Sequence, residues 1–137
     1  MQWTVELLES IRSRAAELDA TNSFFHEDLE ALRDVGYLHP RPLSELVNNQ
    51  RTLARYAPAT ALGLGMHFTW VGVAQTLQAA GDDSLEFVLD GARSGDLFAF
   101  GVSERGNDRV LTDSVSQVTQ VDEGYAFHGE KVFTSLS

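Results

Sequence analysis

The sequence contains no cysteine among its 137 residues. This absence excludes disulfide bonds, thiolate zinc sites, iron–sulfur clusters and cysteine nucleophiles. It agrees with a protein of the reducing cytoplasm, where structural disulfides are rare. The first residues also lack the basic and apolar regions of an export signal. The sequence therefore predicts a cytoplasmic protein.

Basic residues are scarce as well. The chain has 10 lysine and arginine residues against 20 aspartate and glutamate residues, and its formal net charge is −10. Only one of the basic residues, Lys131, is a lysine. A charge of this sign and size repels nucleic acid and anionic lipid, so we expect neither as a partner.

Charged residues are missing altogether from residues 56–81. A run of this length could span a bilayer, but polar side chains interrupt it at Thr60, His67, Thr69, Gln75, Thr76 and Gln78. The run also lacks basic residues on one flank and aromatic belts at its ends. We therefore interpret it as a helix buried inside a helical bundle and expect no membrane partner.

Apolar residues recur every three or four positions near the start of the chain, which predicts amphipathic helices. Thr4 is placed to cap the first helix, and the second is capped by Asn22 or Ser23 and ends at Gly36. Asp28 is expected on the solvent face of the second helix. The apolar stripes of the two helices are Val5, Leu8, Ile11, Ala15 and Leu18, and then Phe25, Leu29, Leu32 and Val35.

Three further helices are expected before residue 95. Pro40 and Pro42 predict an extended link, after which Ser44 opens a third helix over residues 45–57. The uncharged fourth helix carries Pro58 in its first turn and ends at residue 81. The fifth is capped by residue 83 or 84 and turns its apolar face inward at Leu85, Val88, Leu89 and Ala92.

The pattern then changes from helix to strand. Residues 97–102 are apolar and aromatic and predict a strand, which a polar turn follows at residues 103–108. Further strands are predicted near residues 112–121, 125–128 and 131–135, with turns at residues 122–124 and 129–130. We predict an α+β fold, with a helical bundle domain over residues 1–95. Residues 96–137 would form the first antiparallel strands of an incomplete β-barrel-like domain.

Two motifs of the second part carry a resemblance to a known family. Residues 98–104 read FAFGVSE, and residues 124–135 read GYAFHGEKVFTS. Coming after five predicted helices, they resemble the start of the middle β-domain of the acyl-CoA dehydrogenases. In that family a strand ends in Val-Thr-Glu-Pro, and a later segment reads Tyr-x-x-Asn-Gly-x-Lys-x-Trp-Ile-Thr. The apolar spacing of residues 25–36 is similar to the family's second helix.

The resemblance implies a flavin-dependent oxidoreductase with FAD as its cofactor and an acyl-CoA or similar small molecule as its substrate. In the family, backbone amides and hydroxyls of the two motifs contact the flavin and an aromatic residue covers its ring. Gly106 and Asn107 correspond to a turn that approaches the acyl-CoA and are assigned to substrate binding. The intact protein is expected to be a homo-oligomer. The matching cofactor-binding positions here are Phe100, Val102, Ser103, Phe133, Thr134 and Ser135.

The resemblance assigns no catalytic residue to this chain. The family's catalytic carboxylate removes the α-proton while the β-hydrogen leaves as hydride to flavin N5, and it lies in a carboxy-terminal helical domain that no part of this chain matches. Glu104 corresponds to a structural residue at a strand end, and His67 is interpreted as a buried core or pocket histidine. This chain alone is therefore expected neither to hold FAD tightly nor to oxidise acyl-CoA.

Several departures from the family pattern leave the function open between three hypotheses. Arg105 replaces a proline, His128 replaces an asparagine, and residues 42–44 replace a glycine pair. A flavin monooxygenase of the same fold, acting on a non-CoA aromatic substrate, is the second hypothesis, favoured by the aromatic residues Phe68 and Trp70 of the bundle and by the altered turn at Asn107. A truncated binding module without flavin is the third, and the retained residues Phe133 and Ser135 argue against it.

Overall fold

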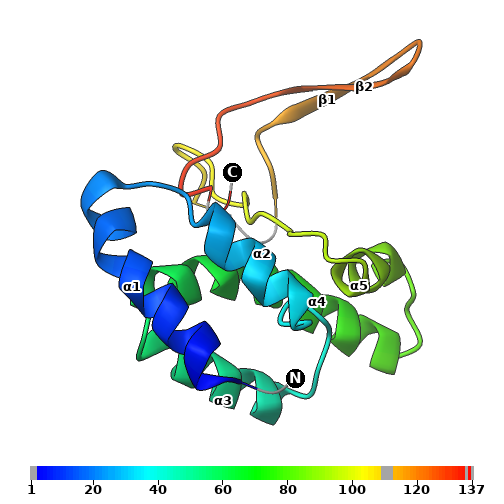
Figure 1. Cartoon of the computed structure of the whole chain (residues 1–137). Coiled ribbons are helices and arrows are strands. Elements are labelled where there is room, and N and C mark those ends of the chain that lie inside the picture. The colour runs from blue at the N-terminus through cyan, green and yellow to red at the C-terminus, as the bar shows by residue number, and fades with distance from the viewer. Residues whose placement is uncertain (1–2, 109–112, 135, 137) are drawn as a thin grey trace. The chain divides into compact units, whose positions relative to one another are not determined.

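The computed structural model describes residues 3–108, 113–134 and 136, in which five helices precede two antiparallel strands (Figure 1). This is the α+β class that the sequence predicts. The chain forms two compact units, residues 1–98 and residues 99–137. All five helices belong to the first unit and both strands to the second.

The first helix, α1, spans Val5–Thr21 and begins as predicted at Thr4, whose side-chain oxygen accepts a hydrogen bond from the Leu7 amide. Asn22 ends α1 in the left-handed conformation, with φ 49°. The prediction that Asn22 or Ser23 caps the second helix is wrong, because Asn22 is used to end the first. Helix α2 spans His26–Asp34 and begins after Phe25 without a side-chain cap.

Gly36 ends α2 as predicted, with φ +69°. Its amide donates to the Arg33 oxygen at 2.8 Å, and the Tyr37 amide donates to the Leu32 oxygen at 2.8 Å. These two bonds form a Schellman motif, and glycine adopts the required left-handed backbone without a Cβ penalty. The chain then turns sharply out of the helix.

The prediction that Asp28 lies on the solvent face is wrong. Its side chain is fully buried, and its Oδ1 accepts a hydrogen bond of 2.7 Å from Nε of Arg14 on α1. Burial raises the pKa of Asp28, and the bond to Arg14 opposes that change. A buried carboxylate requires such a partner, and helical spacing within α2 alone does not reveal one on another helix.

The uncharged helix is central, as predicted. Helix α4 spans Pro58–Ala79 and contacts α1, α3 (Leu43–Ala54) and α5 (Glu86–Arg93). Helix α3 begins at Leu43, one residue before the predicted opening at Ser44, and the cap expected at residues 83–84 is wrong, since α5 has no side-chain cap. No helix in the described parts of the chain combines the length and the apolar content needed to cross a bilayer. The residues that α4 buries are Thr60, Ala61, Leu64, His67, Phe68, Val71 and Ala74.

The second unit contains a two-stranded hairpin. Strand β1 spans Gln117–Val121 and pairs antiparallel with β2, Gly124–His128. The turn between them is at residues 122–123, within the turn predicted at residues 122–124. Every residue of β1 is exposed, and in β2 only Ala126 is partly covered. Among the described residues of this unit Glu104 alone is buried. An apolar core is therefore missing from the described part of the unit.

Two other predicted strands are wrong. Residues 97–102 form no strand, and only Phe100 in that range is a bridge position. In residues 131–134 the only bridge is that of Lys131 with Glu104, and Phe133 leaves the extended conformation with φ 56°. A regular strand needs a hydrogen-bonded neighbour along its length. These segments meet locally, at the Glu104–Lys131 bridge and the bond from the Val132 amide to the Ser103 oxygen, and the described sheet of β1 and β2 includes neither of them.

His67 is the buried polar residue at the centre of the first unit. Its Nε2 lies 3.0 Å from the Leu38 oxygen, and its Nδ1 lies 3.2 Å from the Phe98 amide nitrogen. Because a carbonyl can only accept and an amide N–H can only donate, the ring is neutral with its proton on Nε2. Burial lowers the pKa of His67 from 6.5. The neutral ring therefore connects α4 to two segments outside it.

We expect His67 to make the helical unit less stable in acid. The unfolded chain gains a proton near pH 6.5 while the folded ring resists protonation, so the stability that the neutral ring contributes is present above this pH and declines below it, by at most about 1.4 kcal/mol per pH unit. Denaturation followed by circular dichroism between pH 7.5 and about pH 5 measures this slope. His67→Gln should have a shallower slope, whereas the control His26→Gln, at an exposed position, should keep it. Equal slopes in all three proteins would contradict this role.

Candidate functional site

The two motifs singled out in the sequence lie side by side in the second unit. Glu104 and Lys131 form an antiparallel bridge, and the Val132 amide donates to the Ser103 oxygen at 2.9 Å. A Cβ added to Gly101 would lie only 2.6 Å from Cγ2 of Thr134. We call residues 100–104 and 131–134, which these contacts join, the paired edge.

The paired edge carries five of the six residues assigned to cofactor binding. Phe100, Val102, Ser103 and Thr134 are partly buried. Phe133 is 89% exposed, so its ring is open to solvent. Ser135, the sixth, lies outside the described residues. Among the described residues, none forms a hydrogen bond with the Ser103 hydroxyl, which leaves this group available to a ligand.

The two residues assigned to substrate binding follow the paired edge in a turn. Gly106 has φ +74°, and no heavy atom lies within 4 Å of an added Cβ. The side-chain amide of Asn107 donates to Oε2 of Glu104 at 2.8 Å and to the Asp113 oxygen at 3.1 Å. Both amide hydrogens of Asn107 are thus used within the unit, and its side chain fixes the turn.

Glu104, which the resemblance assigns as a structural residue at a strand end, accepts more bonds than the sequence indicates. Its side chain is 1% exposed, and its two oxygens accept bonds from three separate stretches of chain. The donors are Nζ of Lys131, Nδ2 of Asn107, the amides of Val115 and Ser116, and the hydroxyls of Ser114 and Ser116. The bond from Lys131 and those from residues 114–116 hold the pKa of Glu104 far below its usual range. One available signal was that Lys131 is the only lysine of the chain.

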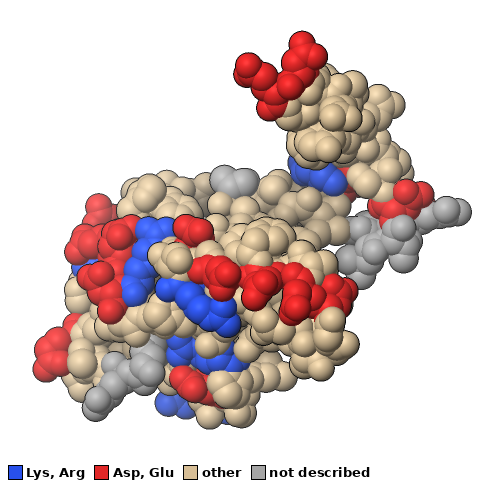
Figure 2. Space-filling model, turned by 90° about the vertical axis from the view of Figure 1, so that its right-hand side faces the viewer, with Lys and Arg blue, Asp and Glu red and all other residues tan. Residues whose placement is uncertain are grey.

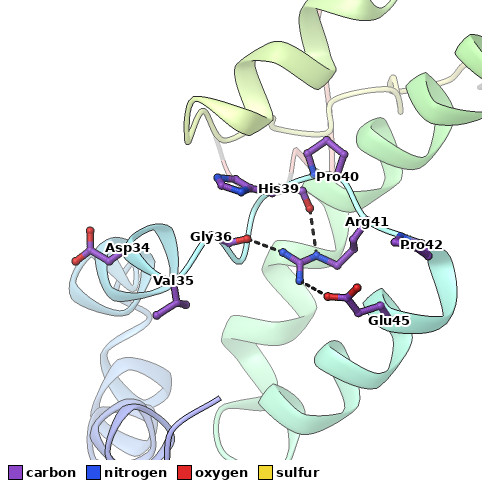
Figure 3. Close-up of a pocket in the computed structure, with 8 residues that line it drawn as sticks. All are labelled: Asp34, Val35, Gly36, His39, Pro40, Arg41, Pro42 and Glu45. Atoms are coloured by element: carbon purple, nitrogen blue, oxygen red, sulfur yellow. Dashed lines mark hydrogen bonds and ion pairs between the residues drawn. The ribbon is translucent and has the colours of Figure 1, made fainter. Parts of the chain in front are cut away.

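The first unit contains a hollow of about 510 Å³ beside the link between α2 and α3, where the side chain of Arg41 lies (Figure 3). Nη2 of Arg41 donates to the Gly36 and Tyr37 oxygens at 2.5 and 3.0 Å. Nε donates to the His39 oxygen at 3.2 Å, and Nη1 donates to Glu45 at 3.1 Å. All three nitrogens are engaged, so Arg41 holds the link between α2 and α3. The hollow is lined by Asp34, Val35, Gly36, His39, Pro40, Arg41, Pro42 and Glu45.

The aromatic residues that favoured a substrate pocket in the bundle belong to its core. Phe68 is 5% exposed, and its ring packs edge-on against Tyr37 with 5.4 Å between centroids. Trp70 is partly buried and packs against the apolar cluster that α4 forms with α5. Phe68 therefore belongs to the packed core of the first unit, and Trp70 borders it.

Charged side chains of both signs share the face of the molecule drawn in Figure 2. In the helical unit several are paired one helical turn apart, as in Arg12–Glu9, Arg33–Glu30 and Arg93–Asp90. Exposed pairs of this kind contribute little to stability. We assign them to the solvated surface.

The chain matches no protein-family model, and comparisons with curated proteins and with solved structures gave no match. The candidate site therefore rests on the residues and contacts of this chain.

Gly101→Ala should separate the two segments of the paired edge. The new methyl group would lie 2.6 Å from the Cγ2 methyl of Thr134, a β-branched side chain that cannot easily turn away. We expect faster hydrogen exchange of the Val132 amide, measured by NMR. The double variant Gly101→Ala/Thr134→Ser lacks that methyl and should recover slow exchange.

Gly72→Ala serves as the control for this experiment, because nothing lies within 4 Å of an added Cβ there. It should leave Val132 exchange unchanged. If Gly101→Ala also leaves it unchanged, the close approach of the two segments is contradicted.

Proposed function

We propose that this chain is the front portion of a flavin-dependent oxidoreductase resembling the acyl-CoA dehydrogenases. Its paired edge would contact FAD, and the substrate would be an acyl-CoA or a similar thioester. The residues in contact with the cofactor would be Phe100, Val102, Ser103, Phe133 and Thr134, together with Ser135.

One observation carries the proposal: the paired edge joins the two motifs of the family resemblance. These motifs are far apart in sequence, and a flavin could contact both only if they were neighbours. The 2.9 Å bond from the Val132 amide to the Ser103 oxygen and the bridge of Glu104 with Lys131 make them neighbours. The five preceding helices also agree with the order of elements in the family.

The chemistry of the paired edge suits a flavin. The exposed ring of Phe133 offers an apolar surface for a planar ring system, because aromatic rings stack favourably. The Ser103 hydroxyl, partly buried and without a bond among the described residues, can donate to a ring nitrogen or oxygen. A bound flavin would supply hydride acceptance, which no amino-acid side chain provides.

A catalytic base is not assigned within this chain. Both oxygens of Glu104 are saturated by donors, and both nitrogens of His67 are bonded in the core. Neither group has a free lone pair with which to take a proton from a substrate. In the proposed enzyme the carboxylate that removes the α-proton would belong to a further domain, as in the family. With Phe68 inside the core, we favour the dehydrogenase over the monooxygenase.

The proposal is tested by flavin content. Protein expressed from the complete coding sequence should purify with about one FAD per chain, identified by absorbance and mass spectrometry. Removing one hydrogen bond costs roughly 1 kcal/mol, so Ser103→Ala should raise the dissociation constant of FAD about fivefold. Ser44→Ala, at an exposed position in the first turn of α3, is the matched control. Protein that neither contains nor binds flavin would contradict the proposal.

A further inference from the structure

Glu104 holds the second unit together where an apolar core would ordinarily do so. Among the described residues it is the only buried one of the unit, while Val118, Phe127 and Phe133 are more than half exposed. The donors to its carboxylate come from residue 107, from residues 114–116 and from Lys131. One side chain therefore fixes three stretches of chain.

The carboxylate is occupied by these bonds and has no capacity for chemistry of its own. A carboxylate offers about four lone-pair directions. Oε2 accepts from Val115 at 2.7 Å and Asn107 at 2.8 Å, and Oε1 accepts from Ser114 and Lys131, each at 2.7 Å, besides Ser116. A base would need an unoccupied lone pair. The role of Glu104 is therefore to hold other groups in place.

We propose that Glu104 is the positioning residue of the flavin site, and that its ionised carboxylate sets the spacing of the two segments of the paired edge. This inference rests on the proposed function. Ser103 precedes Glu104 directly, and Val132, which bonds to Ser103, follows Lys131 directly. The 2.7 Å ion pair of Glu104 with Lys131 therefore ties the two segments together one residue along the chain from Ser103 and two residues from Phe133.

The negative charge of Glu104 is essential for holding the two segments, and a neutral side chain of the same shape would not replace it. All of the partners of Glu104 donate to it, and one of them is a cation. In Glu104→Gln an NH2 group would replace one acceptor oxygen and would face the amide and side-chain donors. Buried donors that lose their acceptor destabilise the arrangement. Glu104→Gln thus keeps the shape of the side chain nearly unchanged but removes the negative charge and one acceptor oxygen.

The first measurement does not involve flavin. Amide hydrogen exchange in this chain should become at least about tenfold faster at Val115, Ser116 and Val132 in Glu104→Gln, and stay unchanged in α1–α5. Glu130→Gln is the control, because Glu130 lies in the same motif but is exposed and pairs with Arg105 on the surface. Unchanged exchange in Glu104→Gln would overturn the inference.

The second measurement separates positioning from general stability. In the flavin-containing protein, Glu104→Gln should raise the dissociation constant of FAD by about tenfold, and adding Ser103→Ala should then have little further effect. The contribution of Ser103 depends on its position, so the two changes are not additive. Ser114→Ala removes only one of the donors to Glu104 and should leave the protein folded. Combined with Ser103→Ala, it should also change the dissociation constant of FAD by less than the sum of the two single effects, but with a smaller deviation than Glu104→Gln.

The outcomes distinguish the two proposals. Absence of flavin from the unmodified protein overturns the proposed function. Flavin binding that Glu104→Gln leaves unchanged overturns this inference alone. Full additivity of the Ser103 change with both Glu104→Gln and Ser114→Ala also overturns it, because a merely structural carboxylate would lower the folded fraction without altering the contact that Ser103 makes.

Discussion

A buried charge must be matched by donors, and the second unit of this chain is arranged around that constraint. The carboxylate of Glu104 is 1% exposed and accepts bonds from Asn107, from residues 114–116 and from Lys131. Because apolar side chains such as Val118 and Phe127 are largely exposed, these polar bonds take the place of an apolar core. The close pairing of residues 100–104 with residues 131–134 follows from them.

The first unit is stabilised in the opposite way. Its core is apolar and includes Ile11, Leu32, Leu53 and Leu64, none of which is exposed. One polar group inside it, His67, is bonded at both ring nitrogens, to the Leu38 oxygen and to the Phe98 amide. The paired edge, in contrast, depends on one side chain remaining ionised.

Helices were predictable from the sequence because their signals are local. The cap at Thr4, the stop at Gly36 and the central uncharged helix each follow from neighbouring residues. Asp28 was misplaced because its partner is on another helix. The strands expected at residues 97–102 and 131–135 were misjudged over the described residues 97–102 and 131–134, because strand formation depends on distant neighbours. The motifs of the candidate site and the structural character of Glu104 could be inferred from the family resemblance. The donors that reach Glu104 from residues 107, 114–116 and 131 could not, because they are distant in sequence.

The central claim is that the paired edge faces a flavin, and chemical-shift mapping tests it most directly. The chain is labelled with 15N, assigned, and titrated with FMN at millimolar concentration, where the weak binding expected of this chain alone is still detectable. The account predicts amide shifts concentrated at residues 100–104 and 131–134, with α1–α5 unaffected. Shifts confined to the helices, or no shifts at the paired edge, would contradict it.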